Sequence, residues 1–124
     1  MLKKGECKIL VVDDAAFMRN IIKDILLKSG FSQIYEAKDG KDAIKYFTKY
    51  KPDIVTLDII MPGVGGLEAL KTILGIEPAT KIIMITSVGQ EQMVQDAIKY
   101  GAKAYVEKPF DDTKLVQIIE KCLA

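Results

Sequence analysis

The side chains of this sequence that could do chemistry share one position, at the end of a short apolar run. They are Asp13, Asp14, Asp58, Thr86 and Lys108. If the runs are parallel strands, their carboxyl ends lie along one edge of a sheet, and ligands of open α/β sheets bind there. We therefore expect three acids, a hydroxyl and a lysine to converge on one crevice, although they are far apart in the chain.

The chemistry that this set of residues could perform is phosphoryl transfer. Three clustered carboxylates repel one another, and one lysine cannot balance them, whereas a divalent cation can. Oxygen ligands suit Mg²⁺, which keeps several waters and completes its shell with a substrate phosphate. Together with the charge of Lys108 and the hydroxyl of Thr86, such an ion would stabilise a transferring phosphoryl group.

Asp58 is the predicted nucleophile. The sequence has no Gly-x-x-x-x-Gly-Lys-Ser/Thr loop, and the glycines of residues 62–66 do not form the Gly-x-Gly-x-x-Gly pattern, so nothing indicates a nucleotide donor. A carboxylate that becomes an acyl phosphate is the remaining choice. Asp58 follows a central apolar run and has no adjacent helix to cap, which distinguishes it from the other acids.

Each of these residues also has an ordinary structural explanation. Asp14 could cap a helix that begins near Ala15, because aspartate is a favoured N-cap residue. Thr86 taken alone could be a turn residue, and Lys108 taken alone could be a solvated surface charge. Only the convergence of several strand ends on one chemistry favours the functional interpretation.

The apolar runs themselves predict a parallel sheet. The runs Lys8–Val12, 54–57 and 81–85 are continuously apolar, as in central strands that are buried on both faces. The runs Gln33–Ala37 and 102–106 are weaker, which suits strands at the edges of the sheet.

Between the runs, apolar residues recur at helical spacing, and Gly30 and Gly101 stand where a left-handed residue would end a helix. The five stripes are Phe17, Ile21, Ile22, Ile25 and Leu26; Ala43, Ile44 and Phe47; Leu67, Leu70, Ile73 and Leu74; Met93, Val94, Ala97 and Ile98; and Leu115, Ile118, Ile119, Cys122 and Leu123. Strands that alternate with helices predict a doubly wound α/β fold. The sequence has no linker, so residues 1–124 are expected to form one domain.

The composition excludes several functional classes. The 124 residues carry a formal net charge of +1, which gives no global field to attract nucleic acid or anionic lipid. No apolar run is long enough to span a bilayer, and the first residues lack the apolar stretch of a signal peptide, so we expect a cytoplasmic protein. Histidine is absent, so any chemistry depends on carboxylates, hydroxyls, lysine and a hard cation.

The sequence resembles the receiver domain of bacterial response regulators over essentially its whole length. The matching segments are Val11-Val12-Asp13-Asp14, residues 52–62, residues 83–87 and Lys108-Pro109-Phe110. Residues 14–19 and 89–94 are most similar to the chemotaxis regulators of that family. The resemblance implies a flavodoxin-like fold, with five parallel strands in the order 2-1-3-4-5 and five helices.

The resemblance also implies how the site would work. Asp58 would take a phosphoryl group from the phosphohistidine of a histidine kinase, or from a small donor such as acetyl phosphate. Asp14, Asp58 and the main-chain carbonyl of Ile60 would bind Mg²⁺ directly, and Asp13 would act through a water. Lys108, before a cis bond to Pro109, would pair with the phosphoryl oxygens.

A conformational switch would follow from phosphorylation. By the same resemblance, Thr86 would move its hydroxyl onto the new phosphate, and Tyr105 would rotate from an outward to a buried position. The face built from the fourth helix, fifth strand and fifth helix would then bind a protein partner, such as a flagellar motor switch protein. We expect a monomer that catalyses only its own phosphorylation and dephosphorylation and is not otherwise an enzyme.

Other functions remain open at this point. A phosphorelay intermediate, which passes the phosphate from Asp58 to a histidine phosphotransfer protein, would use the same site. A phosphatase of the haloacid dehalogenase type would need a second aspartate two residues after the nucleophile, and that position is Ile60. A silent receiver would not need the complete set of acids, threonine and lysine.

Four positions depart from the common receiver pattern. Ile60 and Val88 are apolar where many members carry polar residues, and we expect them to limit the approach of water to the phosphoryl group. Gly65 stands where aspartate is common, and Glu107 stands where an apolar residue is usual.

Overall fold

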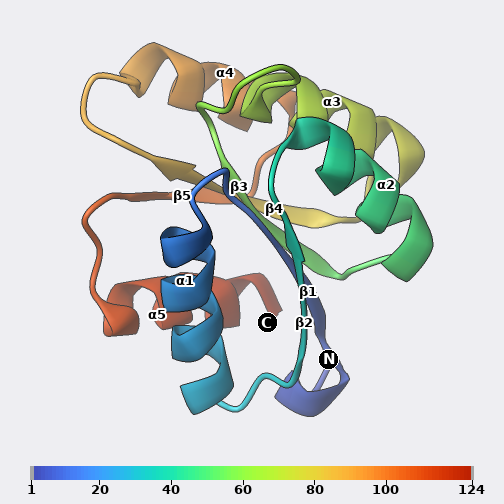
Figure 1. Cartoon of the computed structure of the whole chain (residues 1–124), viewed down its shortest axis with the longest axis vertical. Coiled ribbons are helices and arrows are strands. Elements are labelled where there is room, and N and C mark those ends of the chain that lie inside the picture. The colour runs from blue at the N-terminus through green and yellow to red at the C-terminus, as the bar shows by residue number, and fades with distance from the viewer. Residues whose placement is uncertain (1, 124) are drawn as a thin grey trace.

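The computed structural model describes residues 2–123 and has one parallel sheet between two layers of helices (Figure 1). After a short 3₁₀ turn at Lys4–Glu6, the elements are β1 (Lys8–Val12), α1 (Ala16–Lys28), β2 (Gln33–Ala37), α2 (Gly40–Tyr50), β3 (Ile54–Asp58), α3 (Gly66–Ile76), β4 (Lys81–Thr86), α4 (Glu91–Tyr100), β5 (Ala104–Glu107) and α5 (Asp112–Leu123). The strand order is β2-β1-β3-β4-β5, and every pairing is parallel. The predicted fold class and strand order are confirmed.

The burial of the strands follows the continuity of the apolar runs. All residues of β3 are buried, and β1 and β4 are buried except at their first residue. Only Ala37 of β2 and Val106 of β5 are buried, as expected for edge strands. The predicted central and edge positions are therefore confirmed.

Each face of the sheet has its own core. On one face, α1 and α5 pack Ile22, Leu26 and Leu115 against Ile9 and Ile83. On the other face, α2, α3 and α4 pack further apolar side chains against the sheet, among them Phe47, Leu70, Ala97, Leu57 and Met84. The two layers are separated in Figure 1, with α1 and α5 below the sheet and α2, α3 and α4 above it.

Two helix ends agree with the glycine signals. Gly101 is the C-cap of α4, with φ of 119°, and its N–H donates to the carbonyls of Ala97 and Ile98. Gly30 has φ of 103° and follows the C-cap of α1, Ser29. Both conformations lie in the left-handed region that glycine adopts without a steric penalty.

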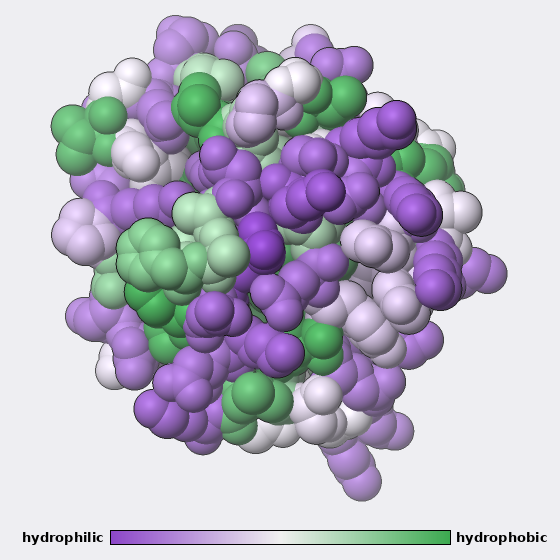
Figure 2. Space-filling model, in the orientation of Figure 1, coloured by the Kyte–Doolittle hydropathy of each residue, from purple (hydrophilic) through white to green (hydrophobic). Residues whose placement is uncertain are grey.

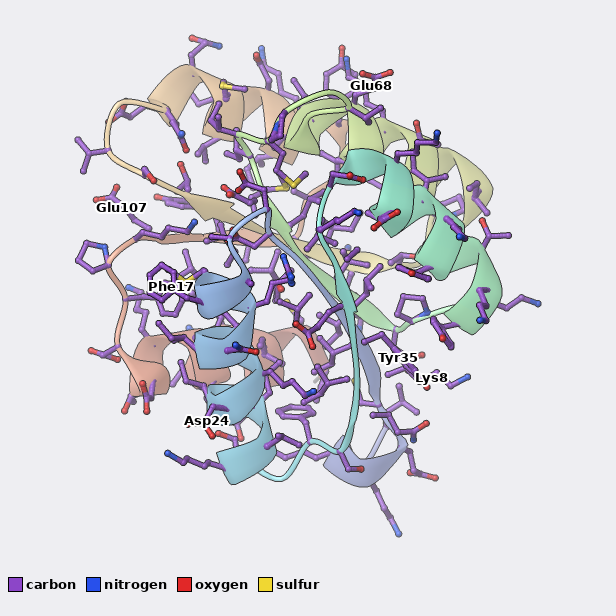
Figure 3. The ribbon with its side chains drawn as sticks, in the orientation of Figure 1. Lys8, Phe17, Asp24, Tyr35, Glu68 and Glu107 are labelled. Atoms are coloured by element: carbon purple, nitrogen blue, oxygen red, sulfur yellow. The ribbon has the colours of Figure 1, made fainter. Side chains whose placement is uncertain are left out.

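Parts of the predicted helix stripes are wrong. Phe17 is 66% exposed, and Ile21 and Ile98 are also exposed, so these three side chains are outside the core. Figure 3 shows Phe17 on the outer side of the first turn of α1. The buried residues of that helix, Ile22, Ile25 and Leu26, come later in the chain. Figure 2 shows apolar residues as scattered green patches among the hydrophilic residues that dominate this face of the molecule.

Within residues 2–123, none of the helices combines the length and the apolar character needed to cross a bilayer.

Candidate functional site

The sheet brings the predicted residues to one edge. Asp58 and Thr86 are the last residues of the neighbouring strands β3 and β4, and Asp58 lies in register with Ile85. Asp13 follows β1 directly, and Lys108 follows β5 directly. The convergence that the sequence predicts therefore arises from the shared direction of four parallel strands.

Three carboxylates form a cluster at this edge. Asp13, Asp14 and Asp58 each offer a carboxylate oxygen, and these oxygens all lie within 4.8 Å of one another. Asp13 and Asp58 are buried, whereas Asp14 is exposed, so the cluster opens to solvent on one side. Several oxygen ligands with an open side fit Mg²⁺, which retains part of its water shell.

Lys108 partly compensates the negative charge of this cluster. Its Nζ lies 3.1 Å from Oδ2 of Asp13 and 3.5 Å from Oδ2 of Asp58. The peptide bond between Lys108 and Pro109 is cis, as the resemblance to receivers implies. One ammonium group facing three carboxylates leaves an excess of negative charge, which is the electrostatic condition for binding a cation.

The alternative explanation of Asp14 as a helix cap is wrong. Helix α1 begins at Ala16, and its N-cap is Ala15, without a side-chain cap. The main-chain N–H of Ala15 instead donates to Oδ1 of Asp13, at 2.9 Å. Asp13 is thus fixed by its own turn, and capping does not account for the acid at position 14.

The pKa of the Asp58 carboxyl is raised from 3.8 to about 6. Burial is the largest cause, because it disfavours the charged form, and repulsion by Asp13 and Asp14 acts in the same direction. The positive charge of Lys108 and a hydrogen bond from the main-chain N–H of Ile60 oppose this shift. Near pH 7 the group is still mainly a carboxylate, the form that a nucleophile requires.

Thr86 is buried, and its hydroxyl points to the start of α4. It donates to Oε1 of Gln90 at 2.9 Å and also lies 3.3 Å from the main-chain carbonyl of Ser87. In this structure the hydroxyl is therefore engaged within its own turn.

Tyr105 is half exposed and borders a cavity of about 450 Å³ between α4 and β5. Thr86, Val94 and Ile98 line the same cavity. The outward orientation that the resemblance implies for a resting receiver agrees with this exposure.

Two glycines that the sequence did not single out hold the loop after β3. A Cβ added to Gly66 would overlap the main-chain carbonyl of Asp58 and lie 2.7 Å from Cα of Ile59. A Cβ on Gly40 would likewise overlap the carbonyl of Val64. Nothing in the local sequence distinguishes these glycines from ordinary turn residues.

An arginine behind the site was missed as well. Nη1 of Arg19 donates to the main-chain carbonyl of Asp13 at 2.7 Å, and its Nε pairs with Oε1 of Glu36 at 3.2 Å. These contacts connect the turn after β1 to α1 and β2. The spacing of Arg19 on a helix gave no indication of this contact.

The departures from the common receiver pattern lie at the surface. Ile60 is 51% exposed and Val88 is 77% exposed. Gly65 is the N-cap of α3 and provides no side-chain cap. A Cβ there would contact the carbonyl of Ile59, at 3.9 Å, which leaves room for a side chain among the described residues. Glu107 is exposed at the end of the edge strand β5 (Figure 3). The structure gives no reason for glutamate at that position.

Comparisons with known proteins agree with this geometry. CheY of Listeria monocytogenes is 49% identical over 114 residues, which cover 92% of this chain and 96% of the relative. A chain of the CheX–CheY–BeF3–Mg²⁺ complex of Borrelia burgdorferi superposes with a TM-score of 0.91 at 34% identity, covering 96% of this chain and 90% of the other.

A second structural relative is NtrX of Brucella abortus, in which a receiver is part of a longer protein. Its receiver domain superposes with a TM-score of 0.89 at 32% identity, covering 94% of this chain and 98% of that domain. The match covers only 26% of the longer NtrX chain. At the level of sequence, the family described as the response regulator receiver domain matches residues 9–120 of this chain. The chain therefore belongs to the response regulator receiver domain family and is CheY-like in sequence and fold.

Proposed function

We propose that this protein is a phosphorylation switch of two-component signalling, in which Asp58 receives a phosphoryl group from a histidine kinase. The observation that carries the proposal is the position of Asp58. Its carboxylate is buried at the end of a central strand, beside two further acids and within 3.5 Å of Lys108. This arrangement combines a nucleophile, a cation site and a fixed positive charge.

In the transfer step, an oxygen of the Asp58 carboxylate forms a bond to phosphorus, and the bond between phosphorus and the donor breaks. With phosphohistidine as donor, the electron pair of the broken bond remains on the imidazole nitrogen, which takes up a proton. Lys108 would move from the carboxylates to the phosphoryl oxygens. Asp14, Asp58 and the carbonyl of Ile60 would hold Mg²⁺, with Asp13 acting through a water, and the ion would neutralise charge on the transferring group.

The conformational response would begin at Thr86. A phosphoryl group adds a charge of about −1.5 to −2 and three strong acceptors, so the Thr86 hydroxyl has a better partner than an amide oxygen. When Thr86 moves, Tyr105 would rotate into the cavity that it now borders. A shift of about 5.5 kcal/mol would reverse a two-state population from 1:99 to 99:1.

The surface that changes would be the one formed by α4, β5 and α5. Tyr105 and Ile98 lie on it and are exposed, which gives a partner apolar side chains to contact. The relatives named chemotaxis protein CheY support a role in chemotaxis. Our proposal adds that the protein acts in the cytoplasm and that its partner is a flagellar motor switch protein. The CheX–CheY complex of Borrelia burgdorferi supports protein binding by such a domain. In our proposal this chain binds its partner as a monomer.

The proposal is tested by intact mass after incubation with acetyl phosphate, with and without Mg²⁺. We expect one phosphoryl adduct that requires Mg²⁺ and maps to Asp58 by peptide analysis. Absence of an adduct from both acetyl phosphate and a histidine kinase would contradict the proposal. An adduct on another residue would show that the nucleophile is wrong.

Ile60 should lengthen the lifetime of the phosphorylated state. The exposed apolar side chain at this position offers water no hydrogen bond, whereas an amide could position an attacking water. We therefore expect Ile60→Asn to speed the loss of the phosphoryl group about fivefold, the effect of roughly one net hydrogen bond. Decay of the adduct after removal of acetyl phosphate measures this, with Ile76→Asn, at an exposed residue at the other end of α3, as the control. Equal lifetimes for wild type and Ile60→Asn would contradict the hypothesis.

A further inference from the structure

The turn between β4 and α4 is held by the side chain of Gln90. Its Oε1 lies 2.8 Å from the main-chain nitrogen of Ser87 and 2.9 Å from Oγ1 of Thr86. A main-chain N–H can only donate, so the Gln90 atom that faces it must be the amide oxygen, and the Thr86 hydroxyl must donate as well. One acceptor thus engages both donors at the carboxyl end of β4.

These two donors belong to the strand next to the phosphoacceptor. Asp58 and Ile85 are register partners, and the N–H of Ile59 donates to the carbonyl of Ile85 at 3.1 Å. Thr86 and Ser87 therefore extend β4 at the same edge at which Asp58 ends β3. A phosphoryl group on Asp58 would bring negatively charged acceptors to donors that the amide oxygen of Gln90 already occupies.

We propose that Gln90 is a positioning residue that keeps Thr86 and Ser87 engaged in the resting protein, so that a phosphoryl group must displace its Oε1. This inference rests on the proposed function of Asp58. The exchange is favourable because hydrogen bonds to a charged acceptor are roughly twice as strong as those to a neutral one. It is less favourable than binding to donors without an internal partner, because the existing bonds must first break.

The position of Gln90 gives this exchange a structural consequence. Gln90 is the N-cap residue of α4, and its main-chain carbonyl accepts from the N–H of Val94 at 3.0 Å. Displacement of its side chain releases the contact between the end of β4 and the first turn of α4. Val88 in the same turn is 77% exposed, so the turn can move without disturbing the core. Gln90 thereby connects the phosphate site to the helix that borders the cavity beside Tyr105.

The test uses beryllofluoride with Mg²⁺ as a non-covalent phosphoryl mimic, followed by amide NMR. Gln90→Met keeps the length of the side chain and removes the acceptor. We expect the half-saturating concentration of beryllofluoride to fall about three- to tenfold, the effect of one net hydrogen bond. The amide resonance of Ser87 in the resting protein should also shift, since its N–H exchanges an amide oxygen for water.

Two further variants make the result specific. Gln92→Met removes an amide in α4 whose side chain, among the described residues, hydrogen-bonds to Asp96 at 3.1 Å and not to the β4–α4 turn. This variant should bind beryllofluoride as the wild type does. In a Thr86→Val background, Gln90→Met should have a smaller effect, because only the Ser87 N–H remains to be released. Wild-type affinity in Gln90→Met, or an equal gain in Gln92→Met, would overturn the proposal while leaving Asp58 as phosphoacceptor. Failure of the wild type to bind beryllofluoride and to form an adduct would instead overturn the proposed function.

Discussion

Asp58→Asn should abolish the phosphoryl adduct completely and at the same time make the folded protein more stable. The first effect follows because an amide cannot form the acyl phosphate. The second follows because Asp58 is buried beside Asp13 and Asp14, and Lys108 compensates only part of this repulsion. A residue kept for chemistry rather than for packing is expected to show this combination of effects.

The stability effect should depend on pH in a defined direction. The pKa of Asp58 is about 6 in the folded protein and 3.8 in the reference state, so the folded state binds this proton more tightly. The contribution of Asp58 to the free energy of unfolding of the wild type is therefore largest below about pH 4. It is lost as the pH rises through about 6. Asparagine does not titrate, so the advantage of Asp58→Asn should be absent near pH 4 and reach about 1–3 kcal/mol above pH 7.

Urea unfolding in EDTA at several pH values measures this difference. Asp112→Asn, at an exposed aspartate in α5, is the control and should show no comparable gain. Adding Mg²⁺ should stabilise the wild type by ligand binding and Asp58→Asn less, because one ligand is lost. A variant that is less stable than the wild type at pH 8 without metal would contradict the electrostatic account.

Gly66→Ala should destabilise the protein by about 2–4 kcal/mol, although it adds only one methyl group. The new Cβ would overlap the carbonyl of Asp58 and lie 2.7 Å from Cα of Ile59. Both obstacles are main-chain atoms, which cannot change rotamer to make room. The loop that carries Ile60 must then move, so adduct formation from acetyl phosphate should also slow.

Gly75→Ala offers a matched control in the same helix. Among residues 2–123, no atom outside the helix backbone and the chain neighbours lies within 4 Å of a Cβ at Gly75. Helix propensity favours alanine there by up to about 1 kcal/mol. The same substitution should therefore stabilise at position 75 and destabilise at position 66, as measured by urea unfolding. Equal stabilisation at both positions would show that the close approach of α3 to β3 has no energetic consequence.

The sequence by itself determined which residues meet at the site. Asp13, Asp58, Thr86 and Lys108 could be placed together because parallel strands share a direction, and therefore their ends share an edge. The continuity of the apolar runs likewise separated the central strands from the edge strands, since a strand covered on both faces has no polar side. Both conclusions depend on the spacing and the polarity of residues along the chain, and the sequence contains that information.

Only the tertiary structure decided how those residues are held. The β4–α4 turn brings Gln90 to the hydroxyl of Thr86, and the start of α3 brings Gly66 against the carbonyl of Asp58. Both contacts depend on how these segments approach the ends of the strands. The exposure of Phe17 and the Ala15 N-cap of α1 also depend on where a helix begins relative to the sheet. Hydrophobic spacing specifies the face of a helix but neither its first residue nor the direction of a loop side chain. These contacts therefore could not be predicted from the pattern of residues alone.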